Sequence, residues 1–207
     1  DIVVILITRK ISWSFKETKL LNFVHNVYKG YFDIFSVVEA KKIKQILVVL
    51  GMGGHTSQIL RLVDSMEKSG EQNYSYSYLL GHDDKTSEKK IKFSGQIYRM
   101  KNPRLMTQKS LFVVFFNMFP ATIDAFKVLW KTDADVVISS GPALSIPLFW
   151  MAKLLFGCRT IFLESWVRWK SGSATGKLVY KVTDLFLVQW KEMKEVYPKS
   201  VYGGRLS

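Results

Sequence analysis

Short, continuous apolar runs alternate with amphipathic stretches along most of the chain. Runs such as "VVIS" and "TIFL" are typical of central strands in a parallel sheet that is covered on both faces. Helical spacing of apolar residues between these runs indicates crossover helices. We therefore predict a doubly wound, Rossmann-like α/β domain over residues 41–207. Its predicted strands are Ile46–Leu50, Tyr74–Leu80, Gln96–Met100, Asp135–Ser139, Thr160–Leu163 and Leu185–Gln189.

The first forty residues follow a different pattern. The opening "DIVVILIT" is too short to span a bilayer, but the basic residues behind it fit the end of a truncated transmembrane helix. Residues 20–35 carry aromatic and aliphatic side chains at helical spacing among lysines, which indicates an interfacial helix. We assign residues 1–40 to a membrane-anchor remnant and an amphipathic segment. The alternatives are a buried edge strand and a helix that packs on the domain.

The start of the chain and one later segment also bear on whether the protein contacts a membrane. The chain opens on Asp1, so we expect it to be part of a longer protein. The apolar stretch Leu111–Phe126 is predicted to be a helix packed on the sheet, with a further membrane contact as the alternative.

Composition narrows the class of protein. The chain has 1 cysteine, Cys158, which excludes an internal disulfide framework and a cysteine-based zinc site and fits a reducing compartment. The net charge of +13 comes from lysines scattered along the chain, without a nucleic-acid-binding motif. Nucleic acid is therefore not expected as a partner. A hydrophobic content of 48% indicates surplus apolar surface for a membrane or another subunit.

The first loop with unusual chemistry is "GMGGHT", between the strand at Ile46 and a predicted helix. Its glycines, Gly51, Gly53 and Gly54, allow a sharp turn and a close approach of the backbone to a ligand. The start of a helix at this point presents free N–H groups to an anion, so the turn suits a phosphate. It is neither a Walker loop nor a dinucleotide fingerprint. The loop ends in His55, and Thr56 or the next residue is predicted to cap the helix.

Two further loops follow predicted parallel strands and so belong to the same edge of the sheet. In "SSGPALSIP", Ser140 and Gly141 offer a hydroxyl and open backbone, and Pro142 is predicted to start the next helix. In "TIFLESWVR", Glu164 ends an apolar strand, where a carboxylate is either functional or a cap or ion-pair partner of Arg168. The polar loop "GHDDK" is predicted to be a solvated turn.

Five motifs together resemble a known family. The stretches "LGMGGHTSQILRLV", "SSGPALSIP", "FLESWVR", "SATGKLVYKVTDLFLVQW" and "YPKSVYGGRL" are similar, in order and spacing, to the membrane-anchoring subunit of a two-subunit transferase. That transferase adds the second N-acetylglucosamine to dolichol-diphosphate-linked N-acetylglucosamine. The resemblance covers residues 43–206. The loops more distantly resemble the acceptor-binding half of the bacterial glycosyltransferase that builds the peptidoglycan lipid precursor.

The resemblance implies the N-terminal, acceptor-side half of a split GT-B glycosyltransferase. A small soluble catalytic subunit would then bind the donor UDP-N-acetylglucosamine, and the acceptor would be a lipid diphosphate at the cytosolic face of the endoplasmic reticulum membrane. We expect inverting transfer, no cofactor, no metal and no activity of the chain alone. The alternatives are a noncatalytic membrane scaffold, a subunit of a bacterial-type polysaccharide glycosyltransferase, and a free-standing nucleotide-dependent oxidoreductase.

The resemblance also assigns roles to individual residues. The acceptor-side base is either His55 or Glu164, and the sequence leaves this choice open. Partner docking is assigned to Val201, Tyr202 and Leu206. The acceptor or its diphosphate is expected to contact Gly51, Gly53, Gly54, Thr56, Ser140, Gly141 and Pro142.

Overall fold

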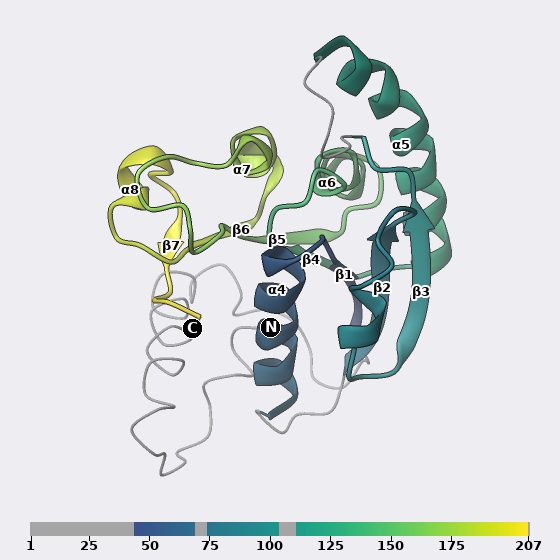
Figure 1. The fold of residues 1–207 in the computed structure, drawn as a ribbon, viewed down its shortest axis with the longest axis horizontal. Helices are drawn as coiled ribbons and strands as arrows, with labels where there is room; N and C mark the ends of the chain where they lie inside the picture. Colours follow the sequence, from purple (N-terminus) through teal and green to yellow (C-terminus); the bar gives the residue numbers. More distant parts are fainter. Residues whose placement is uncertain (1–43, 69–73, 104–110, 207) are drawn as a thin grey trace.

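The computed structural model describes residues 44–68, 74–103 and 111–206. Within these ranges the chain forms a parallel sheet between two layers of helices (Figure 1). The anchor remnant and amphipathic segment predicted for residues 1–40 lie outside the described residues.

The sheet has 7 strands in the order β3-β2-β1-β4-β5-β6-β7, and all of its strand pairs are parallel. All the predicted strands are present, with ends that differ by one or two residues. The last strand was not predicted, because two residues are too short to show a pattern. The strands are β1 (Lys44–Val49), β2 (Tyr74–Gly81), β3 (Gly95–Met100), β4 (Val136–Ser139), β5 (Arg159–Leu163), β6 (Leu185–Val188) and β7 (Val201–Tyr202).

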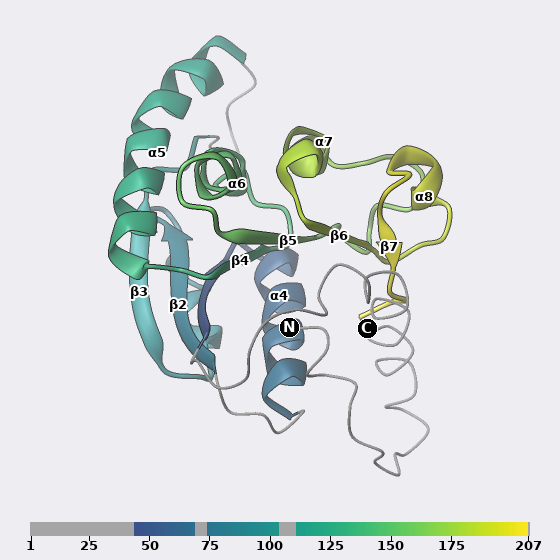
Figure 2. The ribbon, with the colours of Figure 1, turned by 180° about the vertical axis from the view of Figure 1, so that it is seen from behind.

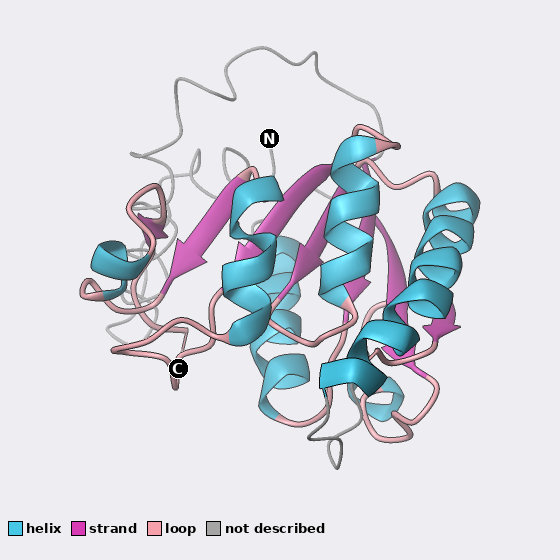
Figure 3. Ribbon diagram, turned by 90° about the horizontal axis from the view of Figure 1, so that it is seen from above, coloured by secondary structure: helices cyan, strands magenta, loops and turns pink. Residues whose placement is uncertain are grey.

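Helices cover both faces of the sheet. The helix α4 (Gly54–Lys68) lies on one face, and the remaining α-helices lie on the other, as the two opposite views show (Figures 1 and 2). Figure 3 looks onto the second layer with the strands behind it. This layer consists of α5 (Leu111–Thr132), α6 (Ser145–Leu154), α7 (Ala174–Val179) and α8 (Met193–Val196). The 3-10 turns η1 (Glu88–Lys90) and η2 (Tyr180–Val182) complete the described elements.

The two faces of the sheet form separate cores. On β1, Ile46 and Val48 pack toward α4, whereas Leu47 and Val49 pack into the core beneath α5 and α6. Successive side chains of a strand point to opposite faces, so a strand covered on both sides is apolar at every position. This explains why the continuous apolar runs predicted the central strands correctly.

The order of the strands places the loops. The chain passes from β1 outward to β2 and β3, and then returns through α5 to β4 on the other side of β1. The loops after β1 and β4 are therefore neighbours at the carboxyl edge of the sheet, at its topological switch point. This is the position where ligands bind in open α/β sheets.

The helix α5 packs on the sheet, as its sequence predicted. Its own residues Ala121, Ala125, Val128 and Leu129 are buried in the core on that side of the sheet, and the helix contacts α6 and β3. Among the described helices, none combines the length and apolar character that a bilayer crossing requires.

Candidate functional site at the carboxyl edge of the sheet

Two hydrogen bonds join the loops after β1 and β4. The His55 ring nitrogen Nδ1 lies 2.5 Å from the carbonyl oxygen of Ser140, and the hydroxyl of Ser140 donates to the carbonyl of His55 at 2.7 Å. These bonds hold the start of α4 against the turn that follows β4. The sequence had placed both loops on one edge, and the structure brings His55 and Ser140 into direct contact.

Two glycines make this close packing possible. A Cβ atom on Gly51 would lie 2.6 Å from the Cβ of Pro142, and a Cβ on Gly141 would lie 2.9 Å from Cε1 of the His55 ring. Gly141 also has a φ of +115°, a backbone conformation that residues with side chains rarely adopt. Gly51 and Gly141 therefore serve the packing of the two loops, with no direct contact to a ligand required.

The other two glycines of the first loop face open space. Gly53 and Gly54 are exposed, and a Cβ built on either would meet no atom within 4 Å. Gly53 has a φ of +70°, and α4 begins at Gly54. The first N–H groups of a helix have no partner within the helix and carry its positive dipole end. An anion can thus approach the backbone at this point without meeting a side chain.

The hydrogen bond to Ser140 sets the chemical state of His55. A carbonyl oxygen only accepts hydrogen bonds, so Nδ1 must carry the proton. In the neutral ring the second nitrogen, Nε2, then has a free lone pair and can accept a proton. The side chain is half-buried beside Gly141, at the same loop that opens at Gly53 and Gly54. His55 therefore has the tautomer that a general base acting through Nε2 requires.

Three other residues predicted to contact the acceptor are packed inside. Thr56 is fully buried, and its hydroxyl bonds to the Gly51 carbonyl and to the hydroxyl of Ser87. Ser140 and Pro142 are also buried. These residues build the walls of the site, and any contact of their side chains with a ligand would require the loops to move.

The predicted helix starts need correction. The helix α4 begins at Gly54, so Thr56 is an internal residue whose hydroxyl bonds backward to Gly51, and it does not cap the helix. The helix α6 begins at Ser145, behind a turn in which the Ser145 N–H donates to the Pro142 carbonyl at 3.0 Å. Pro142 therefore precedes the helix and does not start it. The sequence pattern predicted both helices correctly, but local hydrogen bonds determine the residue at which each one begins.

Glu164 lies at the end of β5 in a closed environment. The residue is 1% exposed, and Oε1 accepts the Ser165 N–H at 2.9 Å. Oε2 accepts the N–H of Ser173 at 3.1 Å, its hydroxyl at 3.0 Å and the hydroxyl of Tyr197 at 3.1 Å. Ser173 in turn caps α7 through Gly176. Glu164 therefore does not cap a helix itself but holds the capping residue Ser173, and the ion pairs of the described residues do not include one between Glu164 and Arg168.

The buried carboxylate also affects its neighbour. Burial, followed by the nearby charge of Glu164, raises the pKa of the Tyr197 hydroxyl well above its ordinary value. Tyr197 therefore stays protonated and continues to donate to Glu164. The carboxylate is also closely packed against the start of α7, because a Cβ on Gly176 would lie 2.4 Å from Oε2 of Glu164.

The polar loop after β2 is largely the solvated turn that the sequence predicted, because His82, Asp83 and Lys85 are exposed, but Asp84 within it is buried. Asp84 is 2% exposed, and its Oδ1 accepts the N–H groups of Thr86 and Ser87 at 3.1 and 2.9 Å. Burial alone would raise the pKa of the Asp84 carboxyl, but these hydrogen bonds hold it below its ordinary value. Through the hydroxyl of Ser87, 2.7 Å from that of Thr56, this loop supports the start of α4.

Sequence reasoning missed two buried glutamines at the same edge. Gln58 on α4 is 4% exposed and Gln189 after β6 is 2% exposed, and their side chains bond to each other at 3.1 Å. A polar residue on the apolar face of a predicted helix was the available signal for Gln58. The partner, 131 positions away, could not be read from the sequence.

The three residues predicted to dock a partner differ in exposure. Val201 and Leu206 are buried in the core on the α4 side of the sheet, at 8% and 5% exposure, whereas Tyr202 is half-buried. Docking at this tail stays a prediction, but the buried pair already packs against the chain's own core.

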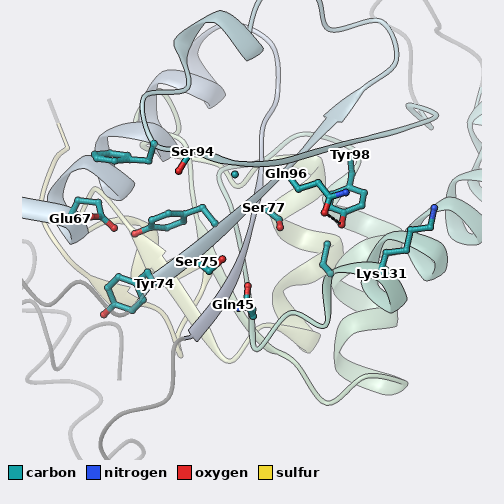
Figure 4. A pocket seen from close by; sticks show the side chains of 13 residues that line it. Gln45, Glu67, Tyr74, Ser75, Ser77, Ser94, Gln96, Tyr98 and Lys131 are labelled. Atoms are coloured by element: carbon teal, nitrogen blue, oxygen red, sulfur yellow. Dashed lines mark hydrogen bonds between the residues drawn. The ribbon is translucent and has the colours of Figure 1, made fainter.

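A polar cleft of about 570 Å³ opens at the opposite, amino edge of the sheet (Figure 4). Residues at the starts of β2 and β3, among them Tyr74, Ser75 and Gln96, line it together with Lys131 from the end of α5. It is remote from the paired glycine loops. Across the residues that the structure describes, no group of three His, Cys, Asp or Glu side chains is arranged to hold a metal ion.

The fold and this edge define the class: a Rossmann-like α/β domain with paired glycine loops at the switch point. The sequence profile described as "Oligosaccharide biosynthesis protein Alg14 like" matches residues 46–206, and the chain belongs to this family. The mouse protein named UDP-N-acetylglucosamine transferase subunit ALG14 is 31% identical over 186 residues, which cover 78% of this chain and 82% of the mouse protein. The human protein of the same name is 31% identical over 181 residues, with the same coverage.

Solved structures support the fold. MurG from Acinetobacter baumannii has a TM-score of 0.53 at 18% identity, over 69% of this chain and 40% of the MurG chain. A UDP-N-acetylglucosamine 2-epimerase has a TM-score of 0.58 at 13% identity, over 77% of this chain and 45% of that enzyme. At these identities the likeness concerns the fold alone. The chain thus corresponds to less than half of either structure.

Proposed function

We propose that this chain is the acceptor-side subunit of an inverting UDP-N-acetylglucosamine transferase. It would add the second N-acetylglucosamine to a dolichol-diphosphate-linked N-acetylglucosamine at the cytosolic face of the endoplasmic reticulum. Family membership and the names of the mouse and human relatives support this assignment. The name of these relatives, a transferase subunit, supports a second subunit, which in this proposal is soluble and binds the donor.

The observation that carries the proposal is the open helix start beside His55. The N–H groups at Gly53 and Gly54 offer partial positive charge to the acceptor diphosphate, and a Cβ atom built on either glycine would meet no atom within 4 Å. The His55 side chain at the same turn has an unprotonated Nε2 in its neutral form. One surface therefore combines an anion-binding backbone with a proton acceptor.

In this mechanism the acceptor hydroxyl attacks the anomeric carbon of the donor sugar. The new carbon–oxygen bond forms as the bond to the UDP oxygen breaks, and the hydroxyl proton passes to Nε2 of His55. The hydrogen bond from Nδ1 to Ser140 orients the ring and stabilises the resulting imidazolium. Glu164 would have no direct part in this step, because its four hydrogen bonds keep it inside the domain.

Substitution of Gly53 tests the open helix start. Gly53→Val places a branched side chain where the diphosphate must approach, and we expect acceptor use to be abolished in the complex with the soluble subunit. Gly157→Val is the matched control, because Gly157 also has a positive φ, +64°, and open space around it but lies between α6 and β5. Both variants carry the same kind of backbone strain. Equal losses of activity in the two variants would attribute the effect to strain and contradict the proposed site.

Membrane association would use the outer face of α5. Phe119, Ile123, Phe126 and Trp130 are 74%, 43%, 40% and 72% exposed and recur at helical spacing. Exposed lysines, Lys127 and Lys131, follow on the same helix. An apolar stripe with basic neighbours suits an anionic bilayer surface.

Vesicle flotation tests this stripe. We expect Phe119→Ser with Trp130→Ser to reduce binding to anionic vesicles about tenfold, because two large side chains no longer enter the bilayer. Ile97→Ser is the control: Ile97 is 37% exposed on β3 and alternates with Tyr98, which packs toward α5, so it belongs to the opposite face. Unchanged flotation of the double variant would assign the exposed stripe to a protein contact.

A further inference from the structure

The end of the described chain is built into the loop that follows β5. The guanidinium carbon of Arg205 lies 5.0 Å from the ring centre of Trp166 and 5.2 Å from that of Trp190. The indole N–H of Trp190 donates to the Trp166 carbonyl at 2.6 Å. We call Trp166, Trp190 and Arg205 the tryptophan–arginine stack. Its three members come from three separate loops, so Arg205 fixes the relative position of the other two.

The buried side-chain amides of Gln58 and Gln189 form a hydrogen-bond network that reaches the same loop. The Gln189 side-chain amide donates to the Glu164 carbonyl at 2.9 Å and to Oε1 of Gln58 at 3.1 Å, and its own oxygen accepts the Leu206 N–H at 3.0 Å. Oε1 of Gln58 also accepts the Trp166 N–H at 3.3 Å. Buried polar groups that are all paired specify one arrangement, since any shift leaves a group without its partner.

Through Gln58 this hydrogen-bond network reaches the candidate site. Gln58 lies on α4 three positions after His55, so the two residues occupy adjacent turns of one helix face. Trp166 is 40% exposed, and Trp169 in the same loop is 53% exposed with the Lys170 ammonium 4.3 Å from its ring centre. Aromatic faces flanked by cations suit a sugar ring joined to a diphosphate. The tail, the loop after β5 and the start of α4 thus form one hydrogen-bonded unit.

We propose that Arg205 is a positioning residue of the acceptor site: it holds the Trp166 loop against α4 through the tryptophan–arginine stack. This inference rests on the proposed function, because it assumes that the acceptor binds at the carboxyl edge. It gives the tail a role within its own chain, in addition to the partner docking predicted for Val201, Tyr202 and Leu206.

Kinetics of the assembled transferase provide the first test. Arg205→Ala is expected to raise the KM for a lipid-diphosphate N-acetylglucosamine acceptor about five- to tenfold, with kcat, the KM for the donor and the Kd for the soluble subunit unchanged. Arg205→Lys should restore part of the affinity, because it keeps the charge but not the planar stack. Lys194→Ala on α8 removes an exposed charge outside the stack and is the control. A raised Kd for the soluble subunit with unchanged acceptor KM would overturn the inference and make the tail a docking element only.

Two further measurements distinguish a failure of this inference from a failure of the proposed function. In a double-mutant cycle, Arg205→Ala and Trp166→Leu should be non-additive in acceptor KM, and additive effects would contradict the stack. Amide hydrogen exchange of the full chain should become faster at residues 165–171 in Arg205→Ala but not in Lys194→Ala, whether or not the chain is active. Unchanged exchange overturns the inference. If Gly53→Val and His55→Gln also leave activity intact, the proposed function itself has failed.

Discussion

His55 and Glu164 follow strands of the same sheet, but their surroundings are opposite. His55 is half-buried, and its side-chain hydrogen bond through Nδ1 leaves Nε2 as the unprotonated nitrogen of the neutral ring. Glu164 is 1% exposed and accepts four hydrogen bonds from Ser165, Ser173 and Tyr197. A group that acts on a substrate needs an unused donor or acceptor that the substrate can reach. The comparison therefore favours His55 as the base and Glu164 as a structural residue.

For the two residues compared, the largest expected effect is on catalysis through His55. His55→Gln keeps the size and hydrogen-bonding capacity of the side chain but cannot take up a proton at neutral pH, so we expect kcat to fall about 10²–10⁴-fold. Steady-state kinetics with a saturating soluble subunit provide the measurement, and thermal unfolding confirms that the fold is retained. A rise in acceptor KM with normal kcat would reduce His55 to a binding residue.

The second expected effect is on stability through Glu164. Glu164→Gln turns an NH₂ group toward donors that need an acceptor, so we expect the free energy of unfolding to fall by about 2–3 kcal/mol. The kcat per folded molecule should stay within about threefold of the wild type. Urea unfolding and active-site-normalised kinetics separate the two quantities. A large loss of kcat at unchanged stability would reverse the comparison between the two residues.

The smallest effect concerns Tyr197. Tyr197→Phe removes one of the four donors to Glu164 and should cost about 1 kcal/mol at pH 7. Because burial and Glu164 raise the pKa of Tyr197 in the folded state, the unfolded chain releases this proton first, and stability falls as the pH rises above about 10.

Two other buried tyrosines contribute to the same pH dependence of stability. Burial also raises the pKa of Tyr78, to about 12, and raises that of Tyr76, so both contribute a loss of the same sign. Urea unfolding between pH 8 and 11 should therefore show a shallower decline in Tyr197→Phe, but not its absence. An identical slope in both proteins would show that Tyr197 does not titrate differently on folding.

The helices and strands were predictable to different degrees. Ile46–Leu50 and its neighbouring runs showed the central strands directly, because burial on both faces makes every position apolar. The start of α4 was placed too late, since Gly54 has no helical signal of its own and the hydroxyl of Thr56 bonds to Gly51. A strand as short as Val201–Tyr202 has no period to detect.

For the candidate site, the sequence determined which residues meet at one edge, because parallel strands place all following loops together. It could not separate His55 from Glu164, since a histidine and a carboxylate at strand ends are equally suited to proton transfer. Only the tertiary structure shows how their surroundings differ, through Ser173 and Tyr197, which lie 9 and 33 positions from Glu164 and donate hydrogen bonds to its carboxylate. Whether a polar side chain is satisfied depends on partners brought together by folding, and local sequence carries no record of them.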